Sequence, residues 1–256
     1  YGEEDYIYFI YTTLINMAVG SGLILLGRGA ENRVTRRDGY CIVAFTWLLF
    51  TGFGMLPFYI SGSIPSVTDA FFETMSGFTT TGATILDDIE ALSHGMLFWR
   101  SFSQWIGGLG IVFFTIAVLP IFGVGNQVLF SAEATGVTHD KIHPKISVMA
   151  QCLWTVYLVL TVAEIVLLLI GGMDLFDAAC HAFSTTATGG YSTKQASMAY
   201  WNSPFIEYVI AIFMILSGIN FSLYFMCMKG RCGQLFKDGE LRLYLISIGA
   251  VTLIIT

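Results

Sequence analysis

The stretch Asp69–Thr84 has the sequence DAFFETMSGFTTTGAT. Its first part consists mostly of small and apolar residues that suit about two to three helical turns, and we expect Asp69 to cap the helix N-terminus. Its second part is rich in threonine and glycine, which are weaker helix formers. A helix this short does not cross a bilayer, which takes roughly 20 residues. The stretch therefore predicts a re-entrant segment, in which a short helix is followed by a non-helical loop.

A second stretch, Leu175–Ser192, repeats this pattern later in the chain. When the two stretches are aligned without gaps, identical residues pair at Asp69 and Asp177, Ala70 and Ala178, Ser76 and Ser184, Thr80 and Thr188, and Gly82 and Gly190. We call this pairing the repeat alignment. Apolar runs flank both stretches at comparable positions, and a third unit begins near Leu241. Internal duplication is common in membrane transport folds. The sequence thus predicts a repeated unit of helix, short helix, glycine loop and helix, as in K⁺ channels.

The composition supports a multi-pass membrane protein. Of 256 residues, 55% are hydrophobic and 12% are charged, whereas soluble domains carry about 25% charged residues. This excludes a soluble enzyme, a nucleic-acid binder and a disordered chain, and we expect the five cysteines to be free thiols. The runs long enough to span a bilayer predict an all-α protein; they are Tyr6–Gly27, Cys41–Ile60, Gly95–Gly123, Ile146–Gly172 and Pro204–Met228, with a partial run from Leu241.

The basic residues predict the orientation of the chain. Segments 28–38, 126–145 and 229–242 hold ten of the twelve Lys and Arg residues, whereas segments 61–94 and 173–203 hold only Lys194. Cytoplasmic loops carry an excess of Lys and Arg, so the first set faces the cytoplasm. Both threonine-glycine loops then face the outside of the cell membrane.

The two loops have the chemistry of a cation path. Non-helical backbone at membrane depth must be buried in protein or line a water-filled path. Glycine lets successive carbonyl groups turn the same way, and a ring of carbonyl oxygens can replace the hydration shell of K⁺. Neither 79–84 nor 187–192 contains Asp or Glu, which favours a monovalent cation over Ca²⁺. The residues alone leave K⁺ and Na⁺ open, and do not distinguish channel-like from coupled transport.

The motifs resemble those of the bacterial Trk-type potassium uptake proteins of the Trk/Ktr/HKT superfamily. Asp69–Thr84 and His181–Ser192 are similar to the first two pore loops, and Leu97–Ile111 and Leu216–Ser222 to the helices that follow them. The resemblance implies potassium uptake through a selectivity filter whose glycines are Gly82 and Gly190. The expected ion ligands are the backbone carbonyls of Thr80, Thr81, Gly82, Ala83, Thr188, Gly189, Gly190 and Tyr191.

The same resemblance implies the organisation of the chain and its partners. Residues 1–38 form a leading helix and cytoplasmic loop, 39–124 and 125–230 two helix–pore–helix repeats, and 231–256 the start of a third. Members have four repeats, so we expect an N-terminal half, and half a filter cannot enclose an ion. The implied partners are a second copy, a cytoplasmic nucleotide-binding regulatory subunit and membrane lipid. K⁺ is the transported ion, and no covalently bound cofactor is expected.

Several polar residues inside the apolar runs have competing interpretations. Arg100, one turn before Gln104, either repels cations, ties its helix to the loop, or extends to the outer interface. Glu164 is either a helix–helix anchor or a cation site. Glu73 either holds the first loop by hydrogen bonds or adds negative potential at the entrance. We expect Gly107, Gly108 and Gly110 to mark close helix packing and Glu207 to lie at the outer interface.

Three rival functions are less well supported by the sequence. An intramembrane protease would use Ser76 with His181 as base, but position 74 is Thr and the G-x-S-G setting is missing. A Na⁺- or H⁺-coupled transporter of another fold would use Glu164 as its carboxylate within the membrane. A metal site at His139 and His143 would lack a third ligand nearby. Pro144 directly follows the pair and disfavours the helix that would bring the two histidines together.

Overall fold

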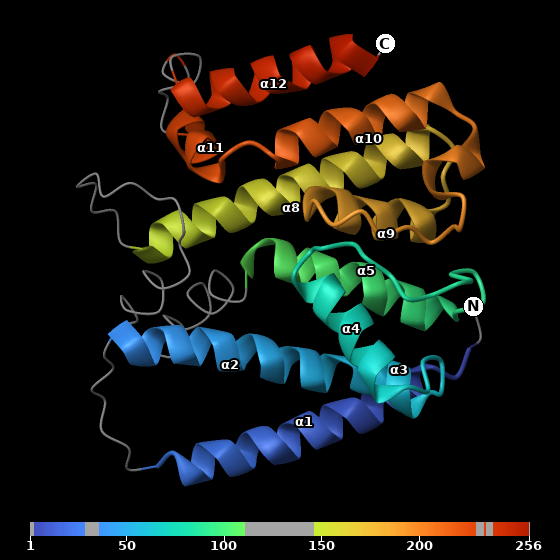
Figure 1. Ribbon diagram of the computed structural model, residues 1–256, viewed down its shortest axis with the longest axis vertical. Helices are drawn as coiled ribbons and strands as arrows, with labels where there is room; N and C mark the ends of the chain where they lie inside the picture. The colour runs from blue at the N-terminus through green and yellow to red at the C-terminus, as the bar shows by residue number, and fades with distance from the viewer. Residues whose placement is uncertain (1–2, 29–35, 111–145, 229–232, 234–237, 256) are drawn as a thin grey trace.

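The computed structural model describes residues 3–28, 36–110, 146–228, 233 and 238–255, and within these ranges the regular structure is entirely helical. The helices follow one another through the molecule roughly in chain order, from α1 (Tyr6–Leu26) at one edge to α12 (Gly239–Ile255) at the other (Figure 1). The all-helical prediction is confirmed for the described residues.

Two helices match predicted membrane-spanning runs closely. They are α1 and α8 (Ile146–Ile170), and both are long and apolar enough to cross a membrane. The predicted run from Gly95 begins as α5 (His94–Gly108), whereas its extension beyond residue 110 lies outside the described residues. The run expected from Leu241 corresponds to α12.

The predicted run Cys41–Ile60 is helical, but the helix is interrupted at one residue. The structure has α2 (Arg36–Gly54) and then α3 (Leu56–Ile60), separated at Met55. The physical reason is Pro57, which lacks a backbone N–H and whose ring clashes with the carbonyl four residues earlier.

The predicted run Pro204–Met228 is also divided. Helix α10 (Pro204–Ser217) ends at Gly218, and α11 (Phe221–Met228) follows after a short break. Two tyrosine hydroxyls satisfy carbonyl groups in the last turn of α10, since Tyr244 donates to Ile215 and Tyr224 to Leu216. Such carbonyls have no partner within the helix, so these side chains stabilise the break.

The two predicted short helices are present as α4 (Val67–Phe78) and α9 (Leu175–Thr186), which have the same length and begin at positions paired in the repeat alignment. Their N-caps are Ser66 and Asp174, so the expected caps Asp69 and Asp177 are wrong by three positions. The residue types at all four positions suit a helix start. Only Ser66 and Asp174 have the extended backbone of an N-cap, and their side chains accept the N–H groups of Asp69 and Asp177.

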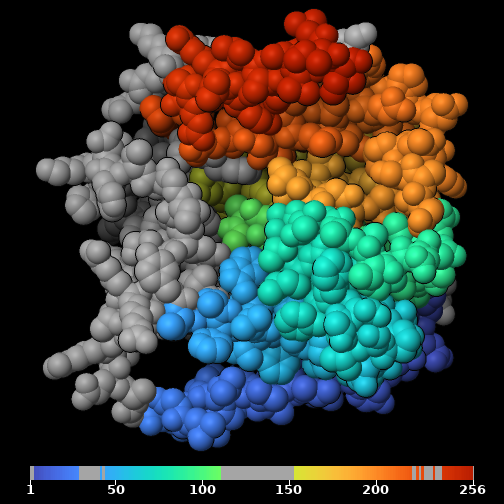
Figure 2. All heavy atoms as spheres, in the orientation of Figure 1, coloured from blue at the N-terminus to red at the C-terminus, as the bar shows by residue number. Residues whose placement is uncertain are grey.

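The distribution of polarity is inverted relative to a soluble protein. Ionisable and amide side chains are buried at the centre, namely Glu73, Arg100, Gln104, Glu164 and His181. Large apolar side chains are exposed along α1, α8 and α12, and α1 and α12 form the outermost layers (Figure 2). Apolar surface of this extent on a monomer marks contact with a membrane or with other protein.

Helix α5 lies between α4 and α9 and packs against both (Figure 1).

Candidate functional site

The two threonine-glycine loops share an unusual backbone conformation. Thr80 and Thr188 have φ angles of 53° and 56°, and Gly82 and Gly190 have φ angles of 74° and 84°. Positive φ is readily adopted by glycine but is uncommon for threonine, for which it is strained. Each loop therefore alternates its backbone direction at the same two positions of the repeat alignment.

The hydrogen bonds that end the two short helices also repeat at aligned positions. In each, a threonine N–H donates three residues back, and the next residue donates five residues back. The pairs are Thr80 to Gly77 at 3.0 Å, Thr81 to Ser76 at 3.0 Å, Thr188 to Thr185 at 2.9 Å, and Gly189 to Ser184 at 2.8 Å. The repeat found in the sequence is thus also a repeat in local geometry.

The loops lie against each other through their backbones. A Cβ atom on Gly82 would overlap the carbonyl oxygen of Gly189, and a Cβ atom on Gly189 would overlap the side chain of Gln104. The Tyr191 hydroxyl donates across to Ala83 O at 3.2 Å and Glu73 O at 3.0 Å. The structure therefore brings the eight predicted site residues into one region.

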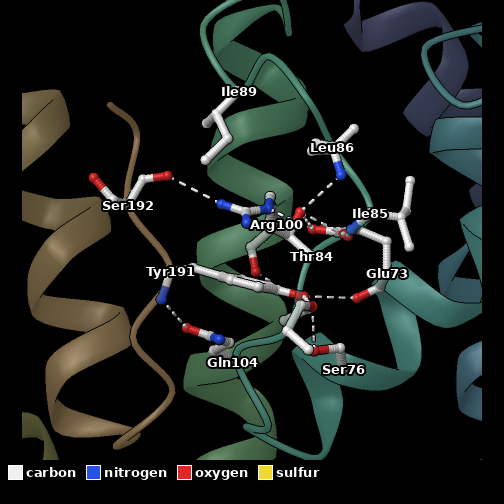
Figure 3. Close-up of polar contacts among 12 residues, drawn as sticks. Glu73, Ser76, Thr84, Ile85, Leu86, Ile89, Arg100, Gln104, Tyr191 and Ser192 are labelled. Atoms are coloured by element: carbon white, nitrogen blue, oxygen red, sulfur yellow. Dashed lines mark hydrogen bonds and ion pairs between the residues drawn. The ribbon is translucent and has the colours of Figure 1, made fainter. Parts of the chain in front are cut away.

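An ion pair behind the loops connects three elements. Arg100 of α5 donates from Nε to Glu73 Oε1 of α4 at 2.6 Å, and from its terminal nitrogen to Ser192 O at 3.0 Å (Figure 3). The guanidinium carbon lies 3.6 Å from the centre of the Tyr191 ring. Arg100 is only 2% exposed, so its extension to the outer interface is excluded and its role as a tie between helix and loops is confirmed.

Glu73 holds the end of the first loop by hydrogen bonds. Its carboxylate accepts the Thr84 hydroxyl and the Ile85 N–H, each at 3.0 Å, in addition to Arg100. Because Arg100 lies against it, the pair is close to neutral, which agrees with the hydrogen-bonding interpretation of Glu73 rather than with added negative potential.

Gln104 supports the second loop from behind. Its Oε1 accepts the Tyr191 N–H at 3.2 Å. The side chain is fully buried, and its Nε2 is without a hydrogen-bond partner among the described residues. Gln104 therefore fixes the backbone just after Gly189 and Gly190.

The close-packing prediction for the α5 glycines is confirmed at two positions. A Cβ atom on Gly107 would overlap the backbone of Phe78 at the end of α4, and one on Gly108 would overlap Ala187 at the end of α9. The C-terminal ends of both short helices therefore rest on the same turn of α5. Gly110 has a φ of 71° just after that turn.

Glu164 lies at the contact between α8 and α9. It is fully buried, and its Oε2 accepts the Thr186 hydroxyl at 3.4 Å. Nearby, Trp105 Nε1 donates to Thr161 at 3.0 Å, and the Tyr157 hydroxyl donates to Trp105 O at 2.9 Å. This polar seam joins α5, α8 and α9, which favours the anchor interpretation of Glu164.

The remaining sequence predictions fall in different places. The Ser76 hydroxyl donates to Ala83 O, whereas His181 contacts Asp177 and Ser192, so the structure gives each a different partner from that required in a protease dyad. Glu207 is exposed in the first turn of α10, as expected. His139 and His143 lie outside the described residues.

A cavity of about 440 Å³ adjoins the second loop. Thr188, Gly189 and Gly190 line one side, and Met214 of α10 and Tyr244 of α12 line another. Thr188 and Gly190 are exposed, as are Thr81 and Ala83 of the first loop. The face of the loops opposite Arg100 and Gln104 is therefore accessible.

Sequence reasoning missed the roles of Tyr191 and Ser192 as contacts of Arg100. A usable signal was present, because a charged residue within an apolar run needs acceptors from neighbouring elements. The sequence alone did not indicate that one of these acceptors would come from the second loop, 92 residues away.

An apolar exterior, a buried polar centre and paired helix–loop segments are features of membrane transport proteins. The family model described as "Cation transport protein", TrkH, matches residues 8–255. The chain therefore belongs to the TrkH family of cation transport proteins, which are not enzymes.

Relatives and a solved structure agree with this assignment. The chain is 42% identical over 240 residues to the Trk system potassium uptake protein TrkH of Escherichia coli, covering 93% of the chain and 50% of the relative. It is 36% identical over 255 residues to TrkG of the same organism, covering 98% and 53%. The potassium transporter TrkH of Vibrio parahaemolyticus is similar in structure, with a TM-score of 0.80 and 35% identity over 96% of this chain and 50% of that one. The chain spans about half the length of these relatives.

Proposed function

We propose that this chain supplies two of the repeated pore units of a Trk-type potassium uptake protein, and that segments 79–84 and 187–192 are two parts of its selectivity filter. The observation that carries the proposal is the pair of matching loops, with positive φ at Thr80, Gly82, Thr188 and Gly190. Alternating backbone direction of this kind can direct successive carbonyl oxygens toward one path.

The surroundings of the loops support a monovalent cation. Helices α4 and α9 both end at the loops, so the partial negative charge at each C-terminus is directed there. The carboxylate of Glu73 is paired with Arg100 behind the first loop. Neutral oxygens thus remain as the ligands, which suits K⁺ better than Ca²⁺.

The predicted ligands are supported unequally by the geometry. The carbonyls of Thr80, Thr81 and Gly82, and those of Thr188, Gly189 and Gly190, belong to the conformationally matched parts of the loops. Ala83 fits less well, because its carbonyl oxygen already accepts hydrogen bonds from Ser76 at 2.6 Å and Tyr191 at 3.2 Å. Tyr191 contributes instead through the hydroxyl that joins the two loops.

Transport is tested in a chimera in which this chain replaces the aligned segment of Escherichia coli TrkH. The chimera is expressed in a strain lacking K⁺ uptake, and Rb⁺ and Na⁺ uptake are measured. We expect Rb⁺ uptake above vector, and a lower Rb⁺/Na⁺ ratio in the Gly190→Ser variant. Tyr208→Leu, at an exposed position on α10, is the matched control. An unchanged ratio in Gly190→Ser would show that this loop is not a filter.

The orientation and partners are part of the same proposal. We place the basic segments 28–38, 126–145 and 229–242 in the cytoplasm and assign the chain to the cell membrane. A membrane-impermeant thiol reagent should label Ser197→Cys from outside and leave Lys141→Cys unlabelled. We further propose a homodimer and docking of a cytoplasmic nucleotide-binding subunit, to be tested by co-purification. Labelling of position 141 from outside would refute the orientation.

A further inference from the structure

The first loop is closed by a hydroxyl that connects it to its short helix. Thr84 Oγ1 donates to the carboxylate of Glu73, with both oxygens at 3.0 Å, and accepts the Leu86 N–H at 3.1 Å (Figure 3). This hydroxyl thus fixes the turn that leaves the loop and fastens it to α4.

The second loop is closed by the same contacts between different residues. The Ser192 hydroxyl lies 3.0 Å from His181 Nε2 and accepts the Lys194 N–H at 3.0 Å. The repeat alignment pairs His181, Ser192 and Lys194 with Glu73, Thr84 and Leu86, respectively. Serine replaces threonine, and an imidazole replaces a carboxylate.

The partners of His181 define which nitrogen carries the proton. Nδ1 lies 2.7 Å from the carbonyl oxygen of Asp177, which can only accept a hydrogen bond. Nδ1 therefore carries the hydrogen, and in a neutral ring Nε2 is an acceptor. The Ser192 hydroxyl then donates to Nε2, just as the Thr84 hydroxyl donates to Glu73.

The charges around position 181 favour a neutral hydrogen-bond acceptor over a carboxylate. Arg100 is already paired with Glu73, and the residue that the repeat alignment pairs with Arg100 is Tyr208, which is 71% exposed. The second loop thus has no arginine at the equivalent position. On the other sides, Asp174 and Asp177 lie at the start of α9, Lys194 lies in the loop, and Trp201 contacts the ring edge. A carboxylate at 181 would face these acids while buried, which is unfavourable.

We infer that His181 is a positioning residue of the second loop, and that its neutral imidazole holds Ser192 and thereby helps to fix the backbone of 188–190 for ion selection. The effect on selectivity rests on the proposed function, since loop geometry affects ion preference only where the loop contacts the ion. In this inference His181 acts through Ser192 rather than as an ion ligand, and its side chain is buried.

Two substitutions in the chimera separate hydrogen bonding from packing. His181→Gln retains an oxygen acceptor near the position of Nε2, whereas His181→Leu retains bulk without an acceptor. We expect the leucine variant to lose about tenfold in the Rb⁺/Na⁺ uptake ratio, equivalent to about 1.4 kcal/mol. The glutamine variant should stay within about twofold of the parent. Ser192→Ala should reproduce the leucine effect, and the Ser192→Ala, His181→Leu double variant should lose no more than either single one.

Hydrogen exchange of amides 188–190 in the purified chimera gives a measurement independent of transport. We expect faster exchange in His181→Leu and Ser192→Ala, and parental exchange in His181→Gln and in the control Tyr208→Leu. If Ser192→Ala exchanges like the parent, the positioning role is overturned, even where His181→Leu fails to fold. If exchange changes as expected but no protein transports Rb⁺, the positioning role stands and the proposed function fails.

Discussion

The backbone of Gly82 lies directly on the carbonyl group of Gly189, so that a side chain at position 82 would overlap the carbonyl oxygen. Gly190 has open space at the corresponding place, although its φ of 84° is as unusual as the 74° of Gly82. The repeat alignment pairs Gly82 with Gly190 and makes them equivalent in sequence. Their requirements differ, because Gly82 is needed for both conformation and space, whereas Gly190 is needed for conformation alone.

Replacing these glycines by alanine should therefore have unequal effects. Gly190→Ala should destabilise the chimera by about 1–2 kcal/mol, the usual effect of a Cβ atom in left-handed backbone. Gly82→Ala should add about 1–3 kcal/mol, because the contact between the loops must open. Thermal unfolding followed by size-exclusion chromatography measures both. Gly172→Ala, with a φ of 95° and open surroundings outside the loops, is the control for conformational strain. Equal loss at positions 82 and 190 would contradict the close approach.

Local sequence signals predicted the elements that carry the site. The short helices and loops were predictable because a change from apolar to threonine and glycine residues marks where helix gives way to loop. The caps were misplaced because Ser66 and Asp69 both suit a helix start, and only backbone conformation distinguishes an N-cap from the third helical residue. The breaks at Met55 and Gly218 were missed, although Pro57 was visible in the sequence, because continuous apolar runs conceal a change of direction.

Contacts between distant segments were not predictable. The Tyr191 hydroxyl reaches Glu73 O across 118 residues, and Arg100 reaches Ser192 across 92. Both contacts depend on how α5 packs between α4 and α9, and no periodic pattern in one helix encodes its packing partner. The sequence identified Arg100 as a charge that is unfavourable within an apolar run. Only the packing of the helices brings it into contact with both Glu73 of α4 and Ser192 of the second loop.

The Arg100–Glu73 pair should behave as one unit. Removing one partner by Arg100→Gln or Glu73→Gln leaves the other charge buried, and each should destabilise the chimera by about 3–5 kcal/mol. The double variant should be more stable than the sum of the single effects implies, since no unpaired charge remains. Thermal unfolding of all four proteins gives the coupling. Strict additivity would show that the two side chains do not stabilise each other.

The start of the chain should separate from α5 in acid. Glu3 accepts the His94 backbone N–H and contacts the His94 ring, both at 2.8 Å, and this bonding holds the pKa of Glu3 below its ordinary value of 4.5. A lowered pKa in the folded state means that the contact contributes stability above about pH 4.5, and loses it as the pH falls through the lower value. Exchange of the His94 amide should therefore rise in acid relative to its intrinsic rate.

The matched variant for this contact is Glu3→Gln, which cannot titrate. Its His94 amide should exchange faster than that of the parent at neutral pH and should show little further acid dependence. The Leu97 amide, which donates to the backbone carbonyl of Ser93 at 3.0 Å rather than to a titratable group, serves as an internal reference in both proteins. Identical acid profiles in the parent and Glu3→Gln would rule out Glu3 as the titrating group.

Position 164 should tolerate a polar amide in place of the Glu164 carboxyl group but not an apolar side chain. Oε2 accepts the Thr186 hydroxyl, and the group lies in a fully buried seam between α8 and α9. Glu164→Gln keeps an acceptor and removes only the ionisable group, so Rb⁺ uptake and thermal stability of the chimera should stay near the parental values. Glu164→Leu leaves Thr186 without this acceptor and should cost about 1–3 kcal/mol. Thr186→Val, which removes the other partner, should add little to Glu164→Leu. Abolished uptake in a folded Glu164→Gln variant would instead identify the carboxylate as a cation site, since only its ability to ionise would have been removed.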